Sequence, residues 1–243
     1  MNKNTFVFHH IKKFPLSGIY KTDPKPLNAA SAWEEDFIYS MIHLNLKSSI
    51  PGFQKALVTH RWPMREPKYK NENIIWHGET VKYMIFEKRF NNFYKLDKQL
   101  FISWAGKDIV KKVIRILNSA FKKEFYLCDI NLDLDKIHSD ISRNVLKNST
   151  IKGGWIKRSD KKPIRIEAAF GDEVTNDSEF RSLANKGDFT NLKVVIPYHM
   201  KNIKCSISLT GSVFFLEDYP LQTCLNFIEY LTKNFQTKQR RNK

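Results

Sequence analysis

Short apolar runs that occur in pairs around tight turns are the feature of this sequence that most limits its fold. IKCSISL and SVFFLED flank Thr210-Gly211, and NIIW and TVKYMIF flank HGE. A third pair, WIKR and PIRIEAAF, flanks a basic loop. Runs of strand length on either side of a short turn are typical of antiparallel hairpins. We therefore expect a sheet that is mixed or mostly antiparallel.

Single helices are predicted between these strand pairs. The clearest has Val110, Ile114, Leu117 and Phe121 along one side of residues 107–122, which is the spacing of an amphipathic helix. Similar patterns predict further helices at about 31–46, 134–146, 176–187 and 220–235. Strand pairs interspersed with single helices indicate an α+β fold with about five helices.

A chain of 243 residues is long enough for one large domain or for two subdomains. A boundary near residue 123 would give a β-rich subdomain over 1–123, with helices at about 31–46 and 107–122. An α+β subdomain would then follow over 124–236 and contain the basic hairpin. Residues 237–243 form a basic tail without an apolar stripe, for which we expect disorder.

The chain carries a large surplus of positive charge. Its 41 lysines and arginines exceed its 25 aspartates and glutamates, which gives a net charge of +16. A fixed charge of this size attracts polyanions and accelerates encounter with them. DNA or RNA is therefore the favoured partner, and an acidic protein subunit or an anionic membrane surface is the alternative.

The densest basic cluster is the hairpin GGWIKRSDKKPIRIE at residues 153–167. Strand alternation places Trp155 and Lys157 on one face and Ile156 and Arg158 on the other. One face is then free to pack on the core while the other offers a cation beside an indole, an arrangement that suits phosphate contact and base stacking. The residues expected to bind nucleic acid here are Lys152, Trp155, Lys157, Arg158, Lys161, Lys162 and Arg165. A hairpin that is charged only for solubility, with Trp155 in the core, is the structural alternative.

Two further basic clusters are expected to lie on the same surface. They comprise Arg61, Arg65 and Lys68 in the segment 55–70, and Lys111 and Arg115 in the helix 107–122. Residues that cluster in sequence need not cluster in space. We predict that these cations form one surface that faces a polyanion, within a nucleoprotein or defence assembly.

A metal-dependent nuclease is the enzymatic alternative. Glu167 lies in a predicted strand, with Asp172 just beyond it and Asp160 upstream. Two or three carboxylates can hold Mg²⁺ and activate a water molecule. The lysine usual two residues after such a strand carboxylate is missing, because Ala169 occupies that position. A binding protein without a cofactor is therefore favoured over an enzyme, and Mg²⁺ belongs only to the nuclease alternative.

Other metal-ligand and catalytic patterns do not occur in the sequence. The 7 histidines and 3 cysteines show no HxxxH and no zinc-like spacing. Asp129, Asp133 and Asp135 have the acidic spacing of a calcium loop, but no glycine or closing glutamate follows, so we expect Asp133 or Asp135 to cap a helix. Each cysteine lies in an apolar pattern and is expected to be buried and inert.

Residues 100–129, LFISWAGKD followed by a helix and FYLCD, resemble the opening strand and helix of TIR domains. The chain then departs from that pattern, because a basic hairpin stands where an apolar strand and the region of a catalytic glutamate would follow. We do not transfer the NAD-cleaving activity of that family to this chain.

The sequence has no apolar run long enough for a membrane span, and its N-terminal apolar run is too short for a signal peptide. Three widely separated cysteines favour a reducing compartment. We therefore expect a cytoplasmic protein.

Overall fold

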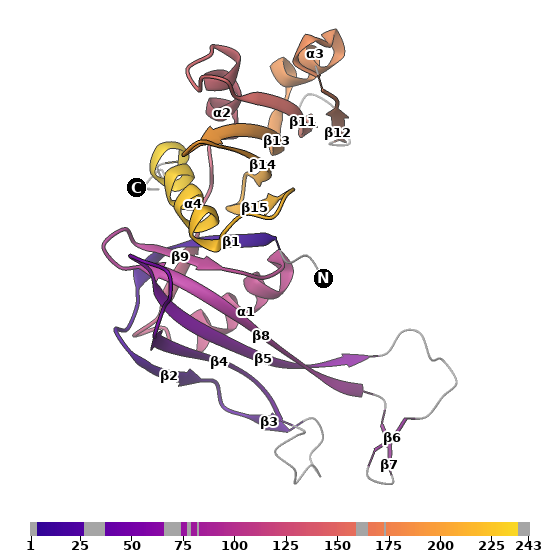
Figure 1. Ribbon diagram of the computed structural model, residues 1–243. Coiled ribbons are helices and arrows are strands. Elements are labelled where there is room, and N and C mark those ends of the chain that lie inside the picture. The colour runs from indigo at the N-terminus through magenta and orange to yellow at the C-terminus, as the bar shows by residue number, and fades with distance from the viewer. Residues whose placement is uncertain are drawn as a thin grey trace, which may run out of the picture.

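The computed structural model describes residues 4–26, 37–65, 74–76, 79–81, 83–158, 165–172 and 174–237. These residues form an α+β protein with one 13-stranded sheet and a separate two-stranded hairpin (Figure 1). Every pairing between described strands is antiparallel. The expectation of a mostly antiparallel α+β fold is confirmed.

The described residues of the N-terminal half form nine strands. They are β1 (Thr5–Lys13), β2 (Gly18–Lys21), β3 (Lys25–Pro26), β4 (Phe37–Leu46), β5 (Gln54–Arg65), β6 (Ile74–Trp76), β7 (Glu79–Val81), β8 (Tyr83–Lys95) and β9 (Leu100–Ser103). β6 and β7 pair with each other as the sequence around HGE predicts. β5 and β8 form the longest pair, from Gln54↔Tyr94 to Arg65↔Tyr83.

The other six strands lie in the described part of the C-terminal half. They are β10 (Tyr126–Asp129), β11 (Thr150–Arg158), β12 (Arg165–Phe170), β13 (Asp188–Tyr198), β14 (Lys201–Ser208) and β15 (Ser212–Phe215). The two predicted hairpins in this half are present as β11–β12 and β14–β15. β12 is the outermost strand on one side of the sheet, since the strand order begins β12-β11-β13-β14-β15-β1.

β1 lies inside the sheet and joins its two halves. Val7 pairs with Ser103 of β9 and with Ser212 of β15, and His9 pairs with Phe101 of β9 and with Asp129 of β10. β9 therefore follows one edge of β1, while β15 and β10 share the other. The segment that resembles the opening of TIR domains forms β9, the helix after it and β10, and β1 lies between the two strands.

The described residues contain four α-helices and one 3-10 turn. They are α1 (Lys107–Ala120), α2 (Leu134–Ser142), η2 (Val174–Asn176), α3 (Ser178–Lys186) and α4 (Leu221–Phe235). The buried residues of α1 are Val110, Val113, Ile114 and Leu117, which follow the predicted stripe. Asp133 caps α2 by accepting a hydrogen bond from the Lys136 amide, so the capping interpretation of the acidic triplet is confirmed.

The helix expected over residues 31–46 is wrong for the part that the structure describes. Residues 37–46 form β4, in which Ser40, Ile42 and Leu44 are buried in alternation. The buried Ser40 Oγ lies 2.8 Å from His60 Nδ1 on the neighbouring strand. Because a polar side chain occupies an inward position, the two-residue period of the strand is hidden in the sequence. About five helices were expected, and the described residues form four.

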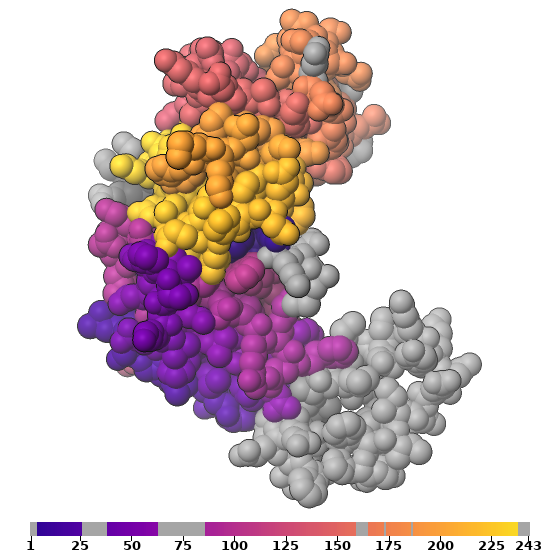
Figure 2. Space-filling view, in the orientation of Figure 1, coloured from indigo at the N-terminus to yellow at the C-terminus, as the bar shows by residue number. Residues whose placement is uncertain are grey.

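Two apolar clusters lie on opposite faces of the N-terminal sheet. Val7 and Phe101 face α1 in one cluster, whereas Phe6, Phe8 and Ile102 belong to the other. The second cluster also contains buried residues of α2, α3, α4, β11, β13, β14 and β15. The yellow C-terminal segments therefore lie directly against the N-terminal half (Figure 2). The sheet is continuous across the expected boundary at residue 123, and the division into two subdomains stays a prediction.

Within the described ranges, no helix combines the length and the apolar character needed to cross a bilayer.

Candidate nucleic-acid interface

The strands β11, β13 and β14 have one buried and one accessible face. Ile156, Leu192 and Ile207 point into the apolar cluster beneath α2, α3 and α4. The alternate residues of the same strands are intermediate or exposed, and we call this accessible side the open face. It carries Trp155, Lys157, Asn191, Lys193, Ser206 and Ser208. The helices of the C-terminal half gather around these strands, whereas α1 lies against the N-terminal strands (Figure 1).

An aromatic patch lies at the outer end of the open face. Trp155 is 46% exposed, Ile166 59% and Phe170 50%. The rings of Trp155 and Phe170 are 5.9 Å apart between centroids and meet edge to face. Because Trp155 is paired with Ala168 and Gly153 with Phe170, these side chains share one face of the hairpin. Large apolar side chains grouped on an exposed face mark contact surfaces more often than chance.

Gly153 allows this patch to form. It has a positive φ of 135°, and a Cβ placed there would lie 2.2 Å from the Phe170 ring and 2.3 Å from the Ala169 carbonyl oxygen. Only glycine adopts this conformation without strain and leaves room for the ring. The basic hairpin is visible in the sequence, but the proximity of Phe170 to Trp155 is not, because it depends on the register of the two strands.

A transverse row of side chains leads from the patch toward β1. Trp155 pairs with Asn191, Asn191 with Ser208, Ser208 with Ser212, and Ser212 with Val7. Partners in an antiparallel register project from the same face, so the row lies on one side of the sheet. The row is polar between its ends, and Asn191 accepts a 2.6 Å hydrogen bond from Ser206.

The row meets the first turn of α1 at Ser208. Lys107 Nζ donates a hydrogen bond of 3.0 Å to Ser208 Oγ, and Ser208 Oγ lies 3.3 Å from Thr210 Oγ1. Gly106 begins the helix without a side-chain cap, so the positive end of the helix dipole has no side-chain acceptor. Burial lowers the pKa of Lys107, and the neighbouring Lys111 lowers it further, while Asp129 and Asp108 raise it.

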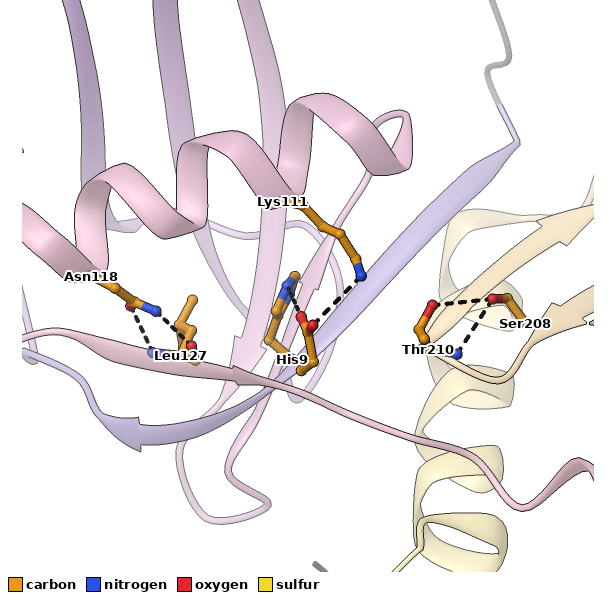
Figure 3. A network of polar contacts seen from close by, with 7 residues as sticks. His9, Lys111, Asn118, Leu127, Ser208 and Thr210 are labelled. Atoms are coloured by element: carbon orange, nitrogen blue, oxygen red, sulfur yellow. Dashed lines mark hydrogen bonds and ion pairs between the residues drawn. The ribbon is translucent and has the colours of Figure 1, made fainter. Parts of the chain in front are cut away.

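A groove of about 800 Å³ runs between α1 and β10. Figure 3 shows Lys111 of α1 and His9 joined by dashed lines to the same carboxylate, which the ion pairs identify as that of Asp129. Lys111 Nζ lies 3.5 Å from Asp129 Oδ2, and His9 Nε2 lies 3.5 Å from Asp129 Oδ1. Burial lowers the pKa of His9 to about 4, against the opposing effect of Asp129. His9 is therefore neutral at pH 7. The sequence did not predict that His9 lines this groove, because it gave no pairing partner for β10.

Lys112 and Arg115 are the exposed cations of this groove. Neither forms an ion pair with an acidic side chain of the described residues. Together with Lys107 and Lys111 they make the outer side of α1 basic, and we call these four residues the α1 ridge. Of the residues predicted from sequence, Lys111 and Arg115 lie on this ridge.

A second groove, of about 440 Å³, lies on the other side of α1. It is lined by Lys112 and by Arg61, whose guanidinium lies 5.6 Å from the centroid of the Tyr39 ring and 3.6 Å from the Glu87 carboxylate. Arg61 is thus held by an aromatic ring and an acid. Arg65 ends β5, and its side chain lies outside the described residues, as does Lys68.

The hairpin cations do not all face outward. Lys157 is exposed on the face of Trp155, as the alternation predicts. Arg158 is buried on the opposite face, where its Nη1 lies 3.6 Å from the Glu167 carboxylate. Arg165 is paired with Arg158 and shares that face. Lys152 forms a 3.2 Å ion pair with Asp172. Lys161 and Lys162 lie outside the described residues.

The carboxylates of the nuclease alternative are engaged elsewhere. Glu167 pairs with Arg158, and Asp172 pairs with Lys152, while Asp160 lies outside the described residues. Among the residues that the structure describes, no group of three His, Cys, Asp or Glu side chains is placed to hold a metal ion. The nuclease alternative stays a prediction.

Two of the cysteines are buried, as expected. Cys205 is fully enclosed, and burial raises its pKa and raises that of Cys224 to about 12. Both thiols are therefore protonated at neutral pH and unreactive. Cys128 is half-buried on β10, which differs from the expectation.

Comparison of the sequence with models of protein families and with curated proteins finds no match. The assignment of function therefore depends on the geometry of the chain itself.

Proposed function

We propose that this protein binds nucleic acid through the sugar-phosphate backbone, along a surface that includes the α1 ridge and the open face. The observation that carries the proposal is the α1 ridge, where Lys112 and Arg115 are exposed without acidic partners among the described residues. Cations that are not neutralised within the protein attract a phosphate chain and release its counterions on binding.

The contact between Lys107 and Ser208 supports the extension of this surface onto the open face. Lys193 and Lys157 continue the positive charge along that face, and the polar side chains between them are hydrogen-bond partners for phosphates and sugars. The hairpin contributes fewer cations than its sequence suggests, because Arg158 and Lys152 are paired with acids.

The test is binding of a labelled oligonucleotide at about 50 mM and about 300 mM salt. Replacement of Lys112 and Arg115 by Glu should weaken binding by at least about tenfold and flatten its dependence on salt, since two phosphate contacts are lost. The matched control replaces Lys147 and Lys233 by Glu. Both are exposed in the C-terminal half, the first after α2 and the second on α4, and the pair makes the same change in net charge.

If the two double variants weakened binding equally, the loss of affinity would be due to net charge alone. That result would refute the α1 ridge as a binding site. Absence of any salt-dependent binding would refute nucleic acid as the partner and favour an acidic protein.

A further inference from the structure

We infer that the open face takes a single strand rather than a duplex, with unpaired bases stacked on Trp155 and Phe170. This inference rests on the proposed function and narrows its ligand. Base faces in a duplex are already stacked on their neighbours, so aromatic rings on a flat protein surface contact the bases of single strands.

The geometry of the two rings suits stacking. Each is about half exposed, and the two rings support each other in an edge-to-face contact, with 69° between their planes and 5.9 Å between their centroids. The Gly153 backbone beneath Phe170 fixes the height of that ring above the sheet. An aromatic side chain that is already held in place loses little conformational entropy when a base stacks on it.

The positively charged side chains around the two rings favour a nucleic-acid strand over an apolar partner. Lys157 lies two residues beyond Trp155 on the same face. Lys193 is in register with Gly153, which is itself in register with Phe170. The rings therefore have a lysine on either side. Asp188 is in register with Lys157, but none of the ion pairs among the described residues joins these two side chains.

The spacing permits one strand to reach both the rings and the α1 ridge. Trp155 and Ser208 are separated by one intervening strand, a distance of roughly 10 Å at the usual strand spacing. Lys107 is hydrogen-bonded to Ser208, so its ammonium group lies at the end of that path. A strand with bases on the aromatic patch thus has its phosphates near the first turn of α1.

The experiment compares a labelled single-stranded oligonucleotide with a duplex of the same length and with polyglutamate. The single strand should bind at least about tenfold more tightly than the duplex. Trp155→Ala should weaken single-strand binding by about tenfold, whereas Trp155→Phe should retain most of it. Val145→Ala is the control, because Val145 is another exposed apolar side chain, 63% accessible, in the segment after α2.

Equal affinity for single strand and duplex, or a Trp155→Ala variant that binds as wild type, would overturn the inference. The proposed function would still stand if Lys112→Glu/Arg115→Glu weakened binding in the same experiment. Polyglutamate binding as tightly as the oligonucleotide would refute both, and so would the failure of every nucleic acid to bind. Circular dichroism and thermal unfolding of each variant verify that it is folded.

Discussion

Lys107 and Ser208 are joined by a hydrogen bond of 3.0 Å that ties the first turn of α1 to the end of β14. These residues come from the two halves of the chain, and their contact places a basic helix at the edge of the open face. The surface that results is built from segments that are distant in sequence.

Lys107→Met should weaken oligonucleotide binding several-fold. The variant keeps most of the apolar stem but removes the ammonium group, so one phosphate contact is lost and the slope of log affinity against log salt should fall by about 1. Fluorescence anisotropy over a salt series measures this slope. Ser208→Ala is the control, because it removes the hydroxyl but keeps the charge. An unchanged slope for Lys107→Met would place the strand away from the first turn of α1.

Gly153→Ala should destabilise the protein by roughly 2–4 kcal/mol, because the new Cβ collides with Phe170 and the residue must keep a positive φ. Gly171→Ala is the matched control. It lies one residue after β12 and has no atom within 4 Å of the added Cβ, so its effect should stay within about 0.5 kcal/mol. Urea unfolding of both variants measures the difference. Similar midpoints would show that the strand can move away from the ring at low cost.

His9→Gln should reduce the loss of stability that accompanies acidification. The pKa of His9 falls from 6.5 in the unfolded chain to about 4 in the folded one, so the unfolded state alone takes up a proton as the pH drops through this window. Stability is therefore complete above pH 6.5 and declines toward pH 4. At pH 5 the contribution lost is about 2 kcal/mol relative to pH 7.5.

Unfolding free energies of wild type and His9→Gln at pH 7.5 and pH 5 test this expectation. The wild type should lose more stability than the variant over that interval. The same loss in both proteins would mean that the imidazole is protonated in the folded state, with Asp129 overcoming the effect of burial.

Asp133→Ala should destabilise the protein by about 1 kcal/mol, because it removes the acceptor for the Lys136 amide at the start of α2. Asp133→Asn should cost only a few tenths of a kcal/mol, because asparagine caps helices equally well. Thermal unfolding with and without calcium measures both effects. Stabilisation of the wild type by calcium, abolished in Asp133→Asn, would instead support an ion-binding role for this acidic segment.

Elements set by local pattern were predictable from the sequence. The stripe on α1 and the hairpins β11–β12 and β14–β15 depend on residues close together in the chain, and the structure confirms them. The sequence of β4 predicts a helix because the polar Ser40 occupies a buried position. The hydrogen bond to His60 that permits this burial cannot be recognised without the neighbouring strand.

The candidate site was predictable only in part. Alternation correctly placed Trp155 and Lys157 on one face of the hairpin and Arg158 on the other. It could not show that Arg158 meets Glu167 or that Phe170 lies beside Trp155, because cross-strand partners depend on register. The transverse row through Asn191 and Ser208 needs the pairing of five strands, and such long-range order leaves no local signal.

The position of β1 in the sheet also affects how the chain folds during synthesis. β1 leaves the ribosome well before β15, yet Val7 must pair with Ser212, and the Phe6 ring packs edge to face on Phe215. All of the polypeptide between these two strands must therefore be translated before β1 can pair with β15. Such late closure slows folding and leaves apolar surface uncovered in the nascent chain, so recovery of the protein from cells should depend on chaperone supply.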